Sequence, residues 1–395
     1  MRDARAVVVC PRLPWPPVYG GQKRTLRLLE AAERAGAHPH LLTDDAGAKA
    51  SEMELTERGW TVEVLKSAPP TTLERARQHL ARLPSPFLSS VAARLSELRA
   101  LGPAFVQLEH TQSAYYMERG DCPTLLSLHN LDSRLHAGLA RRRTPGTPSW
   151  LRAWNRAQEM KAVEDRAFAA ASRVICVSMQ EAATVEHRGG SALVAQNGVD
   201  DALLSLDPGP PPEERVLFFG HLGYEPNRLG LERFLDEGWP EVRRRRAGAG
   251  LEIAGVGLSE GLRRRLAGQP GVDVLGLVDD VGEALAAARA VVVPIWEGGG
   301  TRLKVLESLA AARPVASTPL GVAGLGVDPG EGVVLAESPA SLGAKLAGLL
   351  AEPDRAARLG AEGRRFAQDF RWTRTLAELE ELYRDYVRRW ESTRS

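Results

Sequence analysis

The sequence has no excess of charge of either sign. Its 51 Lys and Arg residues stand against 50 Asp and Glu residues, which gives a net charge of +1. Nucleic-acid-binding proteins usually carry a clear basic surplus, so this balance argues against nucleic acid as a required partner. The charge balance does not argue against a small-molecule ligand.

Cysteine is scarce. The 395 residues include only Cys10, Cys122 and Cys176, each in an apolar stretch and none close to another Cys or His at metal-ligand spacing. This pattern predicts buried, reduced thiols rather than disulfides or a metal centre. Reduced thiols favour a cytoplasmic location.

Long hydrophobic runs are also missing. No eighteen consecutive residues are apolar, and the opening MRDARAVVVCPRLPWPP combines a short apolar run with several prolines. We therefore expect neither a membrane-spanning helix nor a signal peptide. Any membrane attachment would be peripheral, at the inner face and through the N-terminal domain.

What the sequence does contain is a regular alternation of short β-branched runs with helical patterns. Strands are predicted at 5–10, 39–43, 61–65, 105–110, 124–130, 173–178 and 192–198. After the Pro-rich, acidic DPGPPPEE the pattern restarts, with strands at 216–220, 251–255, 272–276, 290–295, 314–318 and 332–336. Continuous apolar strands between helices are typical of parallel sheets covered on both faces.

The pattern predicts two Rossmann-like α/β domains and a C-terminal helix. The domains cover residues 1–198 and 199–371, and an amphipathic helix in 372–395 should dock back on the first domain. Ligands of such sheets bind beyond the carboxyl ends of the strands. We therefore expect the functional residues at a cleft between the two domains.

The segment EGGGTRLKVLE (297–307) follows the strand AVVVPI directly. Its glycines let backbone amides approach an anion, and the start of a helix adds positive potential, so the segment predicts a diphosphate site. Thr301 is the expected N-cap. Lys304 and Glu307 should share a helix face, where a carboxylate can accept hydrogen bonds from ribose hydroxyls. A solvated glycine-rich connection is the alternative.

Three stretches together resemble one family. GGGTRLKVLESLAAARPVAST, GLVDDVGEALAAARAVVVPIW and the linker QNGVD are similar to the carboxyl domain of retaining nucleotide-sugar glycosyltransferases of glycosyltransferase family 4, which have the GT-B fold. The resemblance in layout covers essentially the whole chain. It implies a hexosyltransferase that binds its donor mainly on the second domain and its acceptor mainly on the first.

By resemblance, the donor-binding residues span both domains. Those in the second domain would be Gly220, Val278, Glu297, Gly299, Gly300, Thr301, Arg302, Lys304 and Glu307, with Glu307 holding the ribose. In the first domain, Gly20 and Gly21 would press a loop against the same diphosphate. UDP is the expected nucleotide, and GDP is second because Asp280 could accept a hydrogen bond from guanine.

The sequence departs from the family pattern twice. The first glutamate of the family's pair would fall on Gly299, and Glu297 lies two residues upstream. The sequence therefore does not decide whether Glu297 contacts the donor sugar. His221 and Asn227 occupy the positions of an Arg and a Lys that bind the diphosphate. We expect Arg302 and Lys304 to supply that positive charge.

The first domain supplies the remaining candidates. His129, at the end of TLLSLHN, is similar to the family's active-site histidine and is the predicted catalytic residue. Glu109 and His110, which close FVQLEH, are predicted to contact the acceptor. The arginines of 141–143 with Trp150 and Trp154 suggest a basic aromatic surface for a lipid-linked or anionic acceptor, or else a solvated Arg-rich face.

The reaction implied is a metal-independent, retaining transfer to a hydroxyl, with no cofactor. No Asp-x-Asp motif occurs, and Asp44/Asp45 and Asp279/Asp280 lack a supporting ligand pattern. The acceptor would be a bacterial surface polysaccharide or other glycan, a glycolipid or a glycosylated natural product.

Three rival functions remain. A nicotinamide oxidoreductase finds support only in GVGLSEG (255–261), whose spacing is GxGxxxG rather than GxGxxG. A nucleotide-sugar epimerase would need Glu109 or Glu297 to move a proton. A non-catalytic nucleotide-sugar binding protein would account for the departures at Gly299 and His221.

Overall fold

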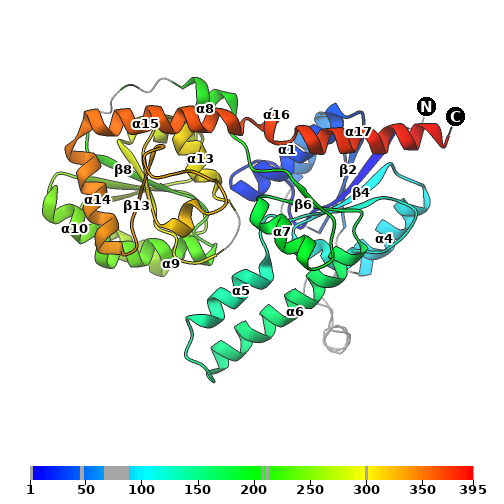
Figure 1. Ribbon diagram of the computed structural model, residues 1–395, viewed down its shortest axis with the longest axis horizontal. Coiled ribbons are helices and arrows are strands. Elements are labelled where there is room, and N and C mark those ends of the chain that lie inside the picture. The colour runs from blue at the N-terminus through cyan, green and yellow to red at the C-terminus, as the bar shows by residue number, and fades with distance from the viewer. Residues whose placement is uncertain are drawn as a thin grey trace. The chain divides into compact units, whose positions relative to one another are not determined.

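The computed structural model describes residues 3–44, 49–65, 89–206, 209, 213–298 and 301–394. The chain forms two compact units. Unit 1 comprises Met1–Gln196 together with Leu376–Ser395, and unit 2 comprises Asn197–Thr375. Each unit is built around one parallel sheet (Figure 1).

The sheet of unit 1 has seven strands in the order β3-β2-β1-β4-β5-β6-β7. In chain order the strands are β1 (Arg5–Val9), β2 (His38–Thr43), β3 (Thr61–Val64), β4 (Phe105–Glu109), β5 (Thr124–Ser127), β6 (Arg173–Cys176) and β7 (Ala192–Val194). Adjacent strands are parallel throughout. The order reverses between β1 and β4, so the sheet is doubly wound.

Helices cover both faces of this sheet. Side chains of one face pack with α4 (Ser89–Ala100), η1 (Thr111–Tyr116), α6 (Pro148–Ala170) and α7 (Met179–His187). The opposite face packs with α1 (Gly20–Arg34), α2 (Lys49–Glu57) and α17 (Ala377–Ser392). Burial of both faces explains why the strands read as continuous apolar runs.

Unit 2 repeats the plan with six strands in the order β10-β9-β8-β11-β12-β13. They are β8 (Arg215–Phe219), β9 (Gly250–Ala254), β10 (Val272–Gly276), β11 (Ala290–Val293), β12 (Val315–Ser317) and β13 (Val333–Leu335). One face packs with α8 (Asp201–Ser205), α12 (Val281–Ala287), α13 (Leu303–Ala310) and η3 (Pro319–Val322). The other packs with α9 (Glu225–Arg233), η2 (Phe234–Gly238), α10 (Trp239–Arg245), α11 (Glu260–Ala267) and α14 (Pro339–Ala351).

The predicted fold class is confirmed: two parallel-sheet α/β domains are present, and every predicted strand exists, most of them a residue or more shorter than predicted. The shortening matters at β5, which ends at Ser127 rather than at Asn130, so His129 lies in the loop beyond the strand. Within the described residues no helix is long and apolar enough to cross a bilayer.

The C-terminal segment is helical, but it is not one helix. After α15 (Pro353–Ala367) and η4 (Gln368–Phe370), α16 (Trp372–Thr375) ends unit 2 and α17 returns to unit 1. There α17 runs beside α1 (Figure 1). The ring of Tyr383 stacks on Phe105 of β4, with centroids 4.8 Å apart.

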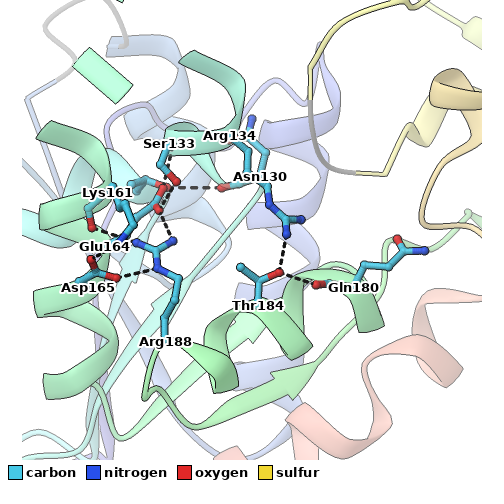
Figure 2. Close-up of polar contacts among 10 residues, drawn as sticks. Asn130, Ser133, Arg134, Lys161, Glu164, Asp165, Gln180, Thr184 and Arg188 are labelled. Carbon is cyan, nitrogen blue, oxygen red and sulfur yellow. Dashed lines mark hydrogen bonds and ion pairs between the residues drawn. The ribbon is translucent and has the colours of Figure 1, made fainter. Parts of the chain in front are cut away.

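A helical hairpin projects away from the sheet of unit 1. It consists of α5 (Asp132–Arg141) and α6, packed along each other (Figure 1). The buried carboxylate of Glu164 accepts hydrogen bonds from the backbone N and from Oγ of Ser133, at 3.0 and 2.5 Å. Arg188 donates to Glu164 and Asp165, so one ionic network joins α5, α6 and the end of α7 (Figure 2).

Candidate active site

The glycine-rich segment of unit 2 leads into α13, which begins at Leu303 with Arg302 as its N-cap. The prediction that Thr301 caps this helix is wrong. Instead, Thr301 Oγ1 accepts a hydrogen bond from Asn197 Nδ2 at 2.8 Å, which ties the segment to the QNGVD linker. Gly299 and Gly300 lie outside the described residues.

Four polar side chains of this segment are buried. Thr301, Arg302, Lys304 and Glu307 are each no more than 9% exposed. Charged side chains are rarely buried to this extent unless they are paired or serve a site. Lys304 and Glu307 are three residues apart in α13 and so share a face, as predicted from their spacing.

Lys304 reaches the carboxyl end of β8. Its Nζ donates to Asn227 Oδ1 at 3.1 Å and lies 4.8 Å from the centre of the Phe218 ring. Burial, together with the neighbouring charge of Arg302, lowers the pKa of this amine to about 7, and Glu307 opposes the shift. A bound anion would restore its charge.

Gly220 provides the space for that ammonium group. Its φ is +146°, and a Cβ added there would lie 2.7 Å from Lys304 Nζ. Asn227, one of the two residues that depart from the family pattern, donates through Nδ2 to the carbonyl of His221 at 2.9 Å and thereby presents its oxygen to Lys304. The lysine of α13 thus reaches the strand-end loop where the family pattern places a lysine from α9.

Glu297 and Val278 are the other described donor candidates of unit 2, and Gly298 and Asp280 lie close to them in the sequence. Gly298, at φ +109°, turns tightly around Arg302, because an added Cβ would lie 3.0 Å from Arg302 Nη2. Glu297 is half-buried beside it. Val278 packs partly against the core. Asp280 Oδ1 accepts from the backbone N of Gly282 at 2.6 Å and so caps α12.

The glycines that suggested a dinucleotide motif have a packing role. A Cβ on Gly255 would lie 1.9 Å from the carbonyl oxygen of Gly220, and one on Gly257 would lie 2.6 Å from the backbone N of Gly223. Both glycines therefore allow the loops after β8 and β9 to touch. This explains GVGLSEG without an oxidoreductase.

In unit 1, His129 forms a pair with Glu109. His129 Nε2 lies 2.9 Å from Glu109 Oε2, and its side chain is 11% exposed whereas that of Glu109 is 0% exposed. Burial, and to a lesser extent the charge of Arg24, lowers the pKa of His129 well below its usual value, so the ring is neutral near pH 7. A neutral imidazole can donate through one nitrogen and accept through the other.

Burial argues against the predicted acceptor contact of Glu109. Besides His129, its carboxylate accepts from Thr25 Oγ1 at 3.1 Å and from Gln107 Nε2 at 2.5 Å. These bonds occupy the carboxylate inside the unit and leave no surface for a substrate. Its geometry is that of a residue that orients His129.

His110 stacks on His129, with ring centroids 3.6 Å apart. It has φ of +63°, an uncommon value for a residue other than glycine, and such strain is frequent at functional sites. Burial lowers the pKa of His110 as well. The two neutral rings therefore form one surface at the ends of β4 and β5.

Gly20 and Gly21 open α1, as predicted from their place after the first strand. A Cβ on Gly21 would lie 3.3 Å from His110 Cε1 and 3.5 Å from His129 Nδ1. The absence of a side chain lets the first turn of α1 lie directly against both imidazoles.

A pocket of about 200 Å³ opens at the same edge of the sheet. Its polar lining includes Arg12, Thr43, Asp44, Gln112 and Ser113, and Tyr116 also contributes. None of these residues was predicted from the sequence as a binding residue. The available signal was position, because Arg12, Asp44 and Gln112 each follow soon after a strand whose carboxyl end faces this edge.

Comparison with known proteins identifies the family. Residues 18–203 match the model described as Glycosyltransferase Family 4, and residues 213–352 match the model described as Glycosyl transferases group 1. The chain therefore carries glycosyltransferase domains of family 4 and of group 1. The predicted family and the prediction that the protein is an enzyme are thereby confirmed.

Solved structures share the fold of this glycosyltransferase at low identity. Sucrose-phosphate synthase from Thermosynechococcus elongatus aligns with a TM-score of 0.71 and 20% identity, over 96% of this chain and 99% of that one. HepE of Anabaena with UDP-glucose gives 0.70 and 16%, over 96% and 98%. TarM of S. aureus, with UDP and α-GlcNAc-glycerol among its ligands, gives 0.69 and 9%, over 96% and 99%. A search of curated proteins gave no match.

Proposed function

We propose that this glycosyltransferase moves a hexose from a nucleoside-diphosphate sugar to a hydroxyl group with retention of configuration. The observation that carries the proposal is the buried polar face of Arg302, Lys304 and Glu307 at the start of α13. Two cations and a carboxylate at that spacing match a diphosphate followed by a ribose. Unit 2 holds the nucleotide, and His129 of unit 1 acts on the sugar.

In the proposed reaction the bond between the anomeric carbon and the β-phosphate oxygen breaks. The acceptor oxygen forms its new bond on the same face of the sugar, and its proton passes to the departing phosphate. The task of the protein is to stabilise the negative charge that develops on that phosphate. Arg302 and Lys304 do so, and Gly299 and Gly300 are proposed to add backbone N–H donors. Within unit 1, Gly20 and Gly21 begin α1 next to His129.

The proposed nucleotide is UDP, with GDP as the alternative. HepE and TarM, which share the fold, were solved with UDP-glucose and with UDP respectively. Asp280 already accepts a hydrogen bond through Oδ1 as the N-cap of α12, which weakens the argument that it recognises guanine. Glu297, half-buried beside Gly298, is the proposed contact to the donor sugar.

The acceptor is proposed to bind at the pocket lined by Arg12, Thr43 and Asp44, next to the histidine pair. A cation, a carboxylate and hydroxyl groups around about 200 Å³ suit the hydroxyls of one sugar unit of a glycan or glycolipid. His110, which stacks on His129, is the predicted residue that contacts both the acceptor and His129.

A peripheral contact with anionic lipid is proposed for the α5–α6 hairpin. Its stretch 133–158 holds no acidic residue and contains Arg134, Arg141, Arg142, Arg143, Arg152 and Arg156. Leu151 and Trp154 are 50% and 45% exposed, and Trp154 stacks on Trp150 at 5.8 Å. Exposed Trp and Leu among arginines match the interface of an anionic bilayer.

Vesicle sedimentation tests this contact. The protein should pellet with phosphatidylglycerol vesicles but not with phosphatidylcholine vesicles, and Leu151→Ser with Trp154→Ser should abolish the pelleting. Arg244→Gln is the matched control, because Arg244 belongs to another basic run but is paired with Glu241. Equal pelleting of wild type and the double variant would contradict the proposal and leave a solvated Arg-rich face.

A panel of nucleotide sugars tests the main proposal and its rivals together. Incubation with an acceptor mixture should release UDP and form a product with the anomeric configuration of the donor. An isomerised sugar with no released nucleotide would indicate an epimerase, and binding without turnover would indicate a non-catalytic protein. The activity should also persist in excess EDTA, because Arg302 and Lys304 are proposed to neutralise the charge of the diphosphate. A strict requirement for Mg²⁺ or Mn²⁺ would contradict a metal-independent transfer.

A further inference from the structure

The central strand β4 carries polar side chains where an apolar face is expected. In FVQLE the residues Phe105, Gln107 and Glu109 alternate and so point to one face of the sheet, towards α1 and α17. Gln107 is 2% exposed and Glu109 0%. Burying such groups is costly unless each is hydrogen-bonded.

A continuous line of hydrogen bonds satisfies them. Tyr383 of α17 donates from its hydroxyl to Gln107 Oε1 at 2.5 Å, and Gln107 Nε2 donates to Glu109 Oε1 at 2.5 Å. The other oxygen of Glu109 lies 2.9 Å from His129 Nε2. The line therefore runs from the C-terminal helix to the proposed catalytic histidine, entirely within unit 1.

The direction of each bond follows from the ionised carboxylate at its centre. A carboxylate only accepts, so Gln107 must turn its amide nitrogen to Glu109 and its oxygen to Tyr383, which must then donate. By the same rule His129 donates from Nε2. Its Nδ1 is left with a lone pair, on the side where Gly21 lies.

We propose that Tyr383 is a positioning residue for catalysis: through Gln107 and Glu109, the C-terminal helix fixes the tautomer and orientation of His129, so that Nδ1 accepts a hydrogen bond from a hydroxyl of the reacting sugars. This inference rests on the role of His129 proposed above.

The groups around Glu109 influence whether it is protonated, and its protonation in turn decides the tautomer of His129. Burial raises the pKa of Glu109, while the hydrogen bonds from Gln107 and Thr25 and the charge of Arg24 favour its charged form. Arg24 of α1 is buried as well and donates to the carbonyl of Ala195 at 2.8 Å. Without the Tyr383 hydroxyl, Gln107 can turn its amide oxygen towards Glu109, which raises the proton affinity of the carboxylate further. A protonated Glu109 would donate to Nε2, and the ring proton would move to Nδ1.

Tyr383→Phe tests the proposal, because it removes the hydroxyl and keeps the ring stacked on Phe105. We expect kcat to fall about 3- to 10-fold at neutral pH while KM for the donor stays within about twofold. The acidic limb of the kcat profile should move to higher pH, because Glu109 takes up a proton earlier. Nitrogen NMR of the imidazoles should show less of the Nε2–H form of His129.

Tyr386→Phe is the matched control. Tyr386 lies one turn further along α17 and packs against the same Phe105 ring, at 5.9 Å, but it is not part of the hydrogen-bonded line. It should leave kcat and the acidic limb unchanged. Equal losses in both variants, or a drop in Tm and donor affinity that parallels the drop in kcat, would reduce Tyr383 to a packing residue and overturn the proposal.

The outcomes separate this inference from the proposed function. If His129→Ala retains normal turnover, the role of His129 in the reaction fails, yet the NMR comparison still shows whether Tyr383 sets its tautomer. If His129→Ala is inactive and Tyr383→Phe has normal turnover and an unchanged Nε2–H signal, the inference fails and the proposed function stands.

Discussion

Lys304 buries its amine against the amide of Asn227 and the aromatic ring of Phe218. Such a group is poorly solvated in the empty protein, and a diphosphate would supply the missing charge. The same residue therefore lowers stability and favours binding, a conflict that is common where a site is built inside a protein.

We expect Lys304→Met to stabilise the unliganded protein and to weaken binding of UDP. The pKa of Lys304 in the folded protein, about 7, lies below the usual lysine value of 10.5, so between these two values the unfolded chain binds more protons and stability rises with pH. The gain in Tm from Lys304→Met should therefore be largest below pH 7 and should vanish towards pH 10.5. Calorimetry at pH 6 and pH 9 measures the difference; an equal gain at both would contradict the shifted pKa.

Glu307→Ala should leave Tm nearly unchanged but weaken UDP binding by about 1.5 to 3 kcal/mol, because charge-assisted hydrogen bonds to the ribose are lost. Isothermal titration with UDP measures the loss. Uridine diphosphate affinity equal to that of the wild type would remove Glu307 from the site.

That Lys304 and Glu307 share one face of a helix could be predicted from their spacing after a buried strand, and their contact with a nucleotide stays a prediction. The complete burial of Glu109 could not be predicted in this way. Its position at the end of a strand favours a substrate contact, whereas the bonds that bury it come from Thr25, Gln107 and His129, on α1, β4 and the loop after β5. Long-range pairs of this kind leave no periodic signal in a sequence.

At the level of elements, strands were easier to predict than the points where helices begin. Apolar runs identify the strands, but the start of α5 depends on Glu164, thirty-one residues beyond Ser133 in the sequence. In the same way, Asn197 donates a hydrogen bond to the hydroxyl of Thr301, so this hydroxyl does not cap α13, which begins at Leu303. Tertiary partners decide these positions.

The network of Figure 2 gives the prediction at this scale. Glu164→Ala leaves Arg188 without its buried partner and removes both bonds to Ser133, so it should destabilise the protein by about 3 to 5 kcal/mol. Asp165→Ala removes a second, 38% exposed partner of the same arginine and should cost about 1 kcal/mol or less. Urea denaturation of both variants compares them; similar costs would show that burial of Glu164 is unimportant.

At the scale of the whole molecule, the chain divides the proposed work between its two units. The groups assigned to the nucleotide, Arg302, Lys304 and Glu307, all belong to unit 2, whereas the paired histidines belong to unit 1. Each unit has its own sheet and core, so a change in one need not alter the other.

His129→Ala should therefore separate binding from turnover. UDP affinity should be unchanged, because every residue assigned to UDP recognition in unit 2 is intact, whereas kcat should fall by about 10² if the contact of the imidazole with the sugar strengthens in the transition state. Titration calorimetry with UDP and steady-state rates with the active nucleotide sugar measure the two quantities on one preparation. Normal turnover would exclude His129 from the reaction. Loss of UDP binding together with turnover would mean that the cavity left beside Glu109 and His110 disturbs more than unit 1, and far-UV circular dichroism with the Tm of the variant would then show the structural change directly.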